Sequence, residues 1–294
     1  EPLPSAPSLG LALLPAPNDG DIFLDLECDP FVQPNGLEYL FGYVAKNPSG
    51  DYAYTGAWAR TPAEEKAAFE SFIDFVIARQ KLYPELRIYH YAPYEPGAFK
   101  RLMGRYATRE QELDGLLRSE CFVDLYSVVR NGVRCGVESY SIKRLEIFYG
   151  FERDAALPGA NKALTRVQTA LEFGEGLEAF KDDCVVVERY NEDDCRSLIG
   201  LRDWLEQIRA AQIAAGALIE RPAPKTAEPP EPLSAQDQAV ADLVDQLCRD
   251  VPVDVSERSA DQHGRWLLAQ NLNWHRREQK AAWWPFYDLA KCSE

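Results

Sequence analysis

The strongest constraint on the fold is the stretch 21–30, DIFLDLECDP, in which two acids interrupt an apolar run. The run predicts a buried strand, and residues two apart in a strand point to the same face, so Asp25 and Glu27 emerge side by side. Burying two like charges is unfavourable unless a cation lies between them. Carboxylate oxygens are the ligands that Mg²⁺ and Mn²⁺ prefer, so the pair indicates a metal site for phosphoryl transfer. The alternative is an acidic pair on an edge strand that faces water.

Two more acids are placed to join this pair. Residues 86–91 predict a strand, and Glu95 follows it at the start of a helix, where open α/β sheets form their sites. The helix dipole would also favour an acid there without any site. In the predicted helix over 183–209, Asp194 lies in phase with the apolar stripe, and Tyr190 precedes it by one turn on the same face. The alternative is that this acidic segment turns outward.

The order of predicted elements indicates one α/β domain. Residues 37–45 and 52–58 read as strands joined by short turns, which form an antiparallel meander with the first strand. Thr61 before a proline is a strong helix start, and a loop over 150–162 precedes a helix over 165–180. The expected division is a Pro-rich linker over 1–20, an α/β domain over 21–210, a second Pro-rich linker over 211–233 and a helical appendage over 234–294.

The appendage is expected to hold two amphipathic helices, over 234–249 and 256–280. The second ends in the run WHRREQKAAWW, which is rich in aromatic and basic side chains. Such a run favours a surface between domains, since Trp and Arg are enriched in protein interfaces. The alternative is contact with nucleic acid through stacking and phosphate pairing.

Composition narrows the class of protein. A formal net charge of −15 excludes nucleic-acid binding through a broad basic surface, although an acidic nuclease site stays possible. Seven scattered cysteines without a Cys-x-x-Cys pair favour a reduced, cytoplasmic setting over disulfides or zinc. Neither a signal peptide nor an apolar run of membrane length is present, so we expect no membrane partner. Because the chain begins without Met, we expect it to be a piece of a longer protein.

These elements and acids, taken in order, resemble the DEDDy subgroup of ribonuclease-H-like 3′–5′ exonucleases. Asp25 and Glu27 match the first motif of that family, and Tyr190 and Asp194 match its Tyr-x-x-x-Asp motif. The middle motif departs from the pattern, because YHYAPYE offers Glu95 where the family usually has Asp. The segments IYHYAPYE, SYSIKRLE, RYNEDDC and HRREQKAAWW together resemble the YprB-like domain found in multidomain RecB-family predicted nucleases.

The resemblance implies a fold, a site and partners. The fold is α/β: a ribonuclease-H-like mixed sheet, with three antiparallel strands and then parallel ones, flanked by helices, plus the C-terminal helical appendage. Two Mg²⁺ or Mn²⁺ ions would be held by four acids, and Tyr190 would position the attacking water. The substrate would be single-stranded DNA or RNA, with RecB-like nuclease and helicase-like domains in the same full-length chain. The four expected ligands are Asp25, Glu27, Glu95 and Asp194.

Two acids are reserve candidates for this site, and two other functions remain open. Asp124 follows a predicted strand, although capping or pairing within its own segment is the favoured explanation for it. Asp193 lies one position out of phase with Tyr190. An endonuclease of the same fold is the rival enzyme. The rival of another class is a catalytically inactive ribonuclease-H-like module that binds nucleic acid or docks neighbouring domains.

Overall fold

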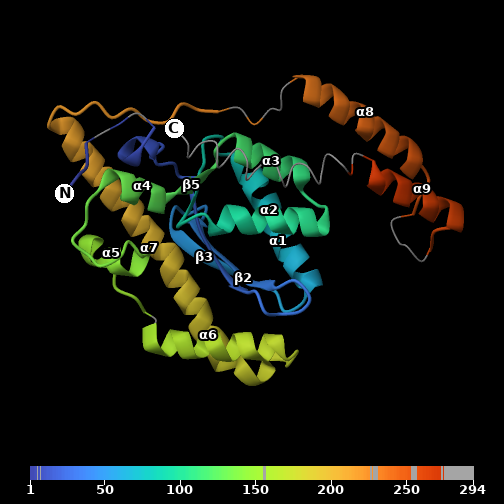
Figure 1. Ribbon diagram of the computed structural model, residues 1–294, viewed down its shortest axis with the longest axis horizontal. Coiled ribbons are helices and arrows are strands. Elements are labelled where there is room, and N and C mark those ends of the chain that lie inside the picture. Colours follow the sequence, from blue (N-terminus) through green and yellow to red (C-terminus); the bar gives the residue numbers. More distant parts are fainter. Residues whose placement is uncertain are drawn as a thin grey trace. The chain divides into compact units, whose positions relative to one another are not determined.

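A computed structural model describes residues 1–274 except 5, 7, 155, 156, 226, 228–230, 253–256 and 273. The chain divides into two compact units, Glu1–Thr226 and Ala227–Glu294. The first unit contains a five-stranded sheet with helices on both faces (Figure 1). The described residues of the second form two helices that pack against each other.

The sheet is mixed, with strand order β3-β2-β1-β4-β5. The first three strands form the expected antiparallel meander, and β4 and β5 then add parallel to β1 and to each other. This arrangement confirms the predicted α/β mixed sheet and places β1 at its centre. The strands are β1 Ile22–Asp29, β2 Leu37–Lys46, β3 Tyr52–Trp58, β4 Ile88–His90 and β5 Phe122–Asp124.

Helix α7 covers one face of the sheet and helices α1 and α2 cover the other (Figure 1). Thr61 caps α1 as predicted, accepting a hydrogen bond from the backbone N–H of Glu64. The helices of the first unit are α1 Pro62–Gln80, α2 Tyr94–Tyr106, α3 Glu110–Arg118, α4 Leu125–Gly132, α5 Ile142–Tyr149, α6 Leu157–Glu172 and α7 Lys181–Ala214, with 3-10 turns η1 Gly10–Leu13 and η2 Leu177–Phe180.

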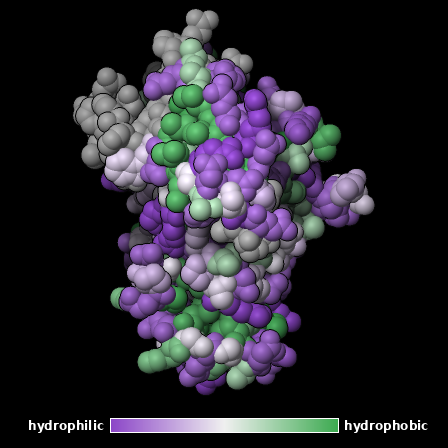
Figure 2. All heavy atoms as spheres, turned by 90° about the vertical axis from the view of Figure 1, so that its right-hand side faces the viewer, coloured by the Kyte–Doolittle hydropathy of each residue, from purple (hydrophilic) through white to green (hydrophobic). Residues whose placement is uncertain are grey.

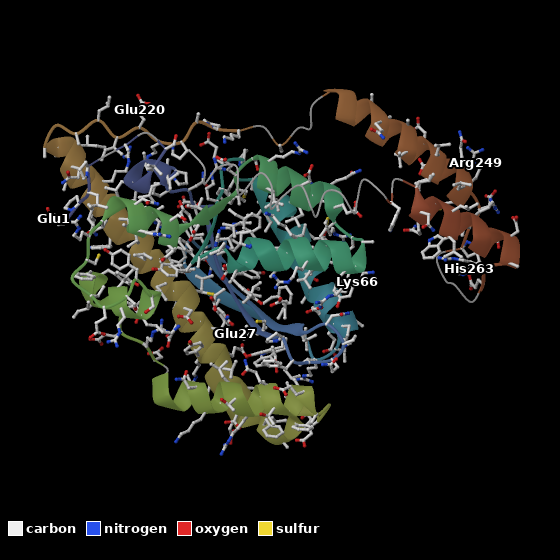
Figure 3. All side chains as sticks on the ribbon, in the orientation of Figure 1. Glu1, Glu27, Lys66, Glu220, Arg249 and His263 are labelled. Carbon is white, nitrogen blue, oxygen red and sulfur yellow. The ribbon has the colours of Figure 1, made fainter. Side chains whose placement is uncertain are left out.

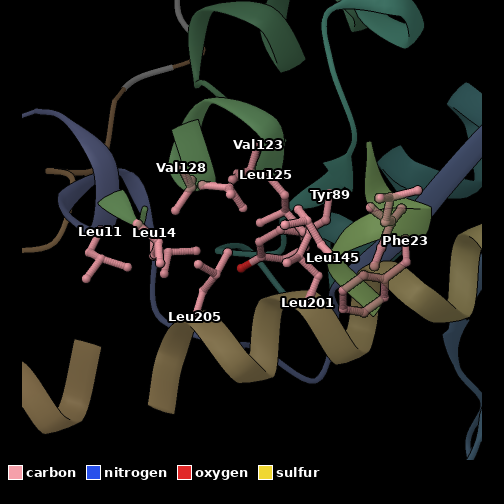
Figure 4. Packing of buried hydrophobic residues seen from close by; sticks show 14 of the residues in the cluster. Leu11, Leu14, Phe23, Tyr89, Val123, Leu125, Val128, Leu145, Leu201 and Leu205 are labelled. Atoms are coloured by element: carbon pink, nitrogen blue, oxygen red, sulfur yellow. The ribbon is translucent and has the colours of Figure 1, made fainter. Parts of the chain in front are cut away.

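The expected N-terminal linker contributes to the core instead. Leu11 and Leu14 are buried against Leu205 of α7 and Val128 of α4, as Figure 4 shows. The composition of residues 1–20 did not reveal this, because a short apolar segment in a 3-10 turn has no periodicity for a pattern to detect. Burial of these leucines removes apolar surface from water and so fastens the segment to the domain.

The helix that was expected over 165–180 is also placed differently. Helix α6 runs over Leu157–Glu172, so it begins inside the stretch 150–162 expected to be a loop and ends before residue 180, and η2 follows it. Its apolar residues Ala163, Val167, Ala170 and Leu171 are buried against β2 and α7. The Pro and Gly at its beginning concealed the helix, although Pro is well tolerated in a first turn.

In the described part of the second unit, α8 spans Glu231–Cys248 and α9 spans Ala260–Asn271. Helix α9 begins at a capping box in which Ser259 and Gln262 bond each other's backbone N–H. The predicted run WHRREQKAAWW lies, after Trp274, outside the described residues. None of the helices within the described ranges is long and apolar enough to span a membrane. Figure 2 shows hydrophilic side chains over most of one face, with hydrophobic ones in smaller groups.

Candidate metal centre

Strand β1 directs its acids toward α7. Phe23, two residues before Asp25, belongs to the core cluster that α7 covers, so the alternation of the strand carries Asp25 and Glu27 to the same face. Both acids are half-buried, whereas the intervening Leu26 is buried on the opposite face. The register with β2 shifts between Glu27 and Cys28, so regular pairing is interrupted directly after the second acid.

Helix α7 brings the third acid to this pair. One carboxylate oxygen each from Asp25, Glu27 and Asp194 lies within 4.8 Å of the other two. Figure 3 labels Glu27 in the region where β1 and α7 pack together. Asp194 is only 7% exposed, as its phase with the apolar stripe predicted. The structure therefore brings together three of the four acids that the sequence singled out.

Glu95 lies at the start of α2, immediately after β4, and is 3% exposed. It does not belong to the three-acid group, although its negative charge raises the pKa of both Asp25 and Glu27. Its Oε2 lies 3.3 Å from Nδ1 of His90, but the geometry forms no hydrogen bond, and this buried oxygen has no hydrogen-bond partner among the described residues. A buried carboxylate oxygen without a donor is suited to a cation.

Tyr190 occupies the predicted position one turn before Asp194 and is half-buried. The Lys143 ammonium lies 4.8 Å from the centre of its ring. Burial raises the pKa of the Tyr190 phenol, and the charge of Asp194 adds to this effect, while Lys143 opposes it. The phenol therefore stays protonated at neutral pH and can donate a hydrogen bond.

Burial and mutual repulsion disfavour the ionised form of the clustered acids. Burial raises the pKa of Asp25 well above its usual range, and the charges of Asp194, Glu27 and Glu95 raise it further. Burial also raises the pKa of Glu27 to about 8, with the charge of Asp194 as the second cause. Lys143 opposes both shifts. Converging oxygens that retain protons at neutral pH fit a divalent cation, which would replace those protons.

Two cations beside the cluster were not singled out from the sequence. The Lys143 Nζ lies 3.3 Å from Oδ2 of Asp194, and Nη2 of Arg153 lies 2.6 Å from its Oδ1. Arg153 also pairs with Glu146 of α5, and its side chain is 7% exposed. Lys143 and Glu146 both belong to the segment SYSIKRLE, so the family resemblance of that segment was the sequence feature that could have pointed to them. Arg153 stands in a loop after α5 with no local pattern to mark it.

The two reserve acids have other partners. Asp124 caps α4, accepting hydrogen bonds from the Tyr126 backbone N–H and the Ser127 hydroxyl, and it also accepts one from the backbone of Ala92. It therefore shapes the loop before Glu95. Asp193 is 4% exposed and accepts a hydrogen bond from the backbone of residue 154. Neither acid belongs to the three-acid group.

Divalent metal binding should tighten as the pH rises from about 6 to about 8. The metal-free fold raises the pKa of Glu27 to about 8, so below that pH a metal must displace protons from its ligands. The same shift makes the metal-free protein less stable as pH rises through this window, because only the folded state still holds those protons. Calorimetric Mn²⁺ titrations at about pH 6, in two buffers of different ionisation enthalpy, should show release of about one proton or more. A binding enthalpy independent of the buffer would contradict protonated ligands.

The comparisons with known proteins agree with this geometry. A family model described as the RNase H superfamily matches residues 22–206, more than half of the chain. The match begins in β1 and ends in α7, so it includes all five strands and the three converging acids. No curated protein and no solved structure gives a significant match. A match of this extent, over the elements that build the acid cluster, shows that the chain belongs to the RNase H superfamily.

Proposed function

We propose that this protein is a metal-dependent 3′–5′ exonuclease that hydrolyses phosphodiester bonds of single-stranded nucleic acid. The observation that carries the proposal is the convergence of three carboxylates, from β1 and α7, within an RNase H superfamily domain. The exonuclease subtype is supported by Tyr190, which precedes Asp194 by one helical turn and lies beside the same acids.

Asp25, Glu27 and Asp194 are the residues that would hold Mg²⁺ or Mn²⁺, and Glu95 is placed to add a fourth carboxylate from α2. When bound, such an ion supplies Lewis-acid chemistry, polarising the scissile phosphate and lowering the pKa of water. Oxygen-only ligands favour these hard cations over zinc, which prefers nitrogen and sulfur.

The other side chains of the cluster have roles that follow from their charge state. The neutral phenol of Tyr190 is a poor base, so its contribution is to orient the attacking water by hydrogen bonding. Burial disfavours the charged form of Lys143, but Asp194 and Tyr190 outweigh this and raise its pKa, so the ammonium persists at the cluster. It thereby limits repulsion between the acids and an incoming phosphate.

A cleavage assay with three substrates tests the proposal. The chain is incubated with 5′-labelled linear DNA and RNA strands of matched sequence and with an internally labelled DNA circle, first with Mg²⁺ and then with Mn²⁺. We expect stepwise shortening of a linear strand from its 3′ end, an intact circle, and loss of all cleavage in excess EDTA. Opening of the circle would instead indicate an endonuclease of the same fold.

A second candidate function is a non-catalytic module that grips nucleic acid or docks other domains. The ion pairs of Asp194 with Arg153 and Lys143 favour it, because they neutralise one of the three acids without any metal. The same assay separates the two functions. A non-catalytic module leaves the linear strands and the circle uncut with either metal.

A further inference from the structure

Two glycines lie next to Asp25 across the sheet. Asp25 of β1 is in register with Gly42 of β2, and Gly42 is in register with Gly56 of β3. Neither glycine has a positive φ, so backbone conformation does not explain them. Their missing side chains leave space on the sheet face that α7 covers, beside the candidate metal ligand.

Two polar side chains fill this space. A Cβ atom at Gly42 would lie 1.5 Å from Oδ1 of Asn191, and one at Gly56 would lie 2.8 Å from the hydroxyl oxygen of Tyr54. The Tyr54 hydroxyl donates a hydrogen bond of 2.9 Å to that same Oδ1 of Asn191. The glycines are therefore required by the close approach of Tyr54 and Asn191, and any larger residue at Gly42 displaces the Asn191 amide.

Both the oxygen and the nitrogen of the Asn191 side-chain amide form hydrogen bonds. Its Nδ2 donates to the Oδ2 atom of Asp25 at 2.9 Å and to the backbone oxygen of Asp25 at 3.2 Å. The backbone carbonyl of Asp25 can only accept a hydrogen bond, and burial raises the pKa of Tyr54 so that its hydroxyl remains a donor. The amide therefore has one consistent orientation, with nitrogen toward Asp25 and oxygen toward Tyr54. Asn191 is fully buried, so water does not compete for these bonds.

We propose that Asn191 is a positioning residue of the metal centre, which holds the Asp25 carboxylate in the orientation that meets Glu27 and Asp194. This inference rests on the proposed metal site and adds a device that acts before metal binds. Three carboxyl groups with oxygens within 4.8 Å of one another repel one another when they ionise, so an unrestrained Asp25 side chain would then rotate away from the others. A donor on Oδ2 restrains that rotation and leaves the other oxygen for a cation. Tyr54, Gly42 and Gly56 in turn hold Asn191.

Mn²⁺ binding to the full chain, measured by calorimetry, tests this role apart from nuclease activity. We expect Asn191→Leu to raise the Mn²⁺ dissociation constant about tenfold or more, as the loss of a partner to a metal ligand does in other sites. Gly42→Ala should act in the same direction by displacing the amide, and Tyr54→Phe should give about a threefold increase, the size of one hydrogen bond. Wild-type affinity in Gly42→Ala and Tyr54→Phe would overturn the proposal, even where Asn191→Leu fails to fold.

Two matched controls isolate the effect. Tyr43→Phe removes a hydroxyl from the sheet face that packs on Phe72 and Phe75 of α1, and Gly104→Ala adds a methyl group in α2 with no atom within 4 Å. Both should bind Mn²⁺ as the wild type does. A general loss of stability would lower the melting temperature of any destabilised variant. The positioning role instead lowers the Mn²⁺ affinity only in the variants at Asn191, Gly42 and Tyr54.

A second measurement needs no metal and separates this inference from the proposed function. In the metal-free protein, NMR should show the Asn191 side-chain amide as a slowly exchanging pair of signals whose shifts move in Tyr54→Phe and in Asp25→Ala. A rapidly exchanging pair, unchanged in both variants, would overturn the proposal. If the wild type binds no Mn²⁺ while the amide is protected as expected, the proposed function fails and the Asn191 contact to Asp25 stands.

Discussion

The Asp25→Asn variant should lose metal-dependent phosphodiester hydrolysis by about a thousandfold or more, because several kcal/mol of transition-state stabilisation depends on each metal-holding carboxylate. The fold should survive, since the amide has the shape of the acid and its oxygen can still accept the hydrogen bond from Asn191. Rates of strand shortening under saturating Mn²⁺, compared with the wild type, measure the loss. Full activity in this variant would remove Asp25 from the centre.

The same variant should be more stable than the wild type in the absence of metal, by about 2 to 4 °C in melting temperature at about pH 9. Burial and the charges of its neighbours raise the pKa of Asp25, so ionising it at high pH destabilises the folded state, and Asn cannot ionise. The gain should shrink as the pH falls and vanish only below about pH 4, the usual pKa of an Asp carboxyl, where Asp25 is protonated in the unfolded chain as well as in the folded one. Glu192→Gln is the matched control, because Glu192 lies two residues before Asp194 but pairs outward with Arg196. It should leave rate and stability nearly unchanged.

Replacing Arg153 by Met should lower the free energy of unfolding by about 3 kcal/mol or more. The guanidinium lies between Asp194 and Glu146, and its side chain is 7% exposed, so its removal takes the cation from buried Glu146 and one of two cations from buried Asp194. Urea denaturation of the metal-free protein measures the change. Mn²⁺ should restore part of the lost stability, because a cation at the acid cluster again compensates Asp194.

Arg144→Met provides the comparison for this loss. Arg144 lies in the same region of the chain, but its side chain is 62% exposed and its partner Glu138 is 83% exposed. Exposed pairs of this kind contribute about 0 to 1 kcal/mol, so the variant should unfold almost as the wild type does. Equal effects of the two substitutions would mean that Arg153 has no special role at the acid cluster.

The stability of the wild type in Mn²⁺ also bears on the choice between catalysis and docking. If Arg153 and the acids it pairs with serve only the fold, Mn²⁺ should not change the stability of the wild type. If Asp194 exchanges its cations for a metal, Mn²⁺ should raise the wild-type melting temperature in a concentration-dependent way. The Lys143 side chain is 31% exposed and the Arg153 side chain 7%, so Lys143 is the more accessible of the two cations.

The sequence by itself determined the parts of this protein that depend on local pattern. Alternation along β1 predicted that Asp25 and Glu27 share one face, and the helical period of α7 predicted that Asp194 faces the core. Short turns then predicted the antiparallel meander, while the parallel strands of the mixed sheet were implied by the resemblance to ribonuclease-H-like domains. These features depend on residues only a few positions apart in the sequence, so they can be predicted from the sequence pattern.

Only the tertiary structure decided which groups surround those acids. Arg153 and Lys143 reach Asp194 from segments 41 and 51 residues away, and Asn191 reaches Asp25 across 166 residues through the gap at Gly42. Leu11 and Leu14 joined the core for the same reason, since burial there depends on α4 and α7. A contact between distant segments produces no periodic pattern in the sequence of either segment. Such contacts are decided by how the elements pack and by the register of the strands.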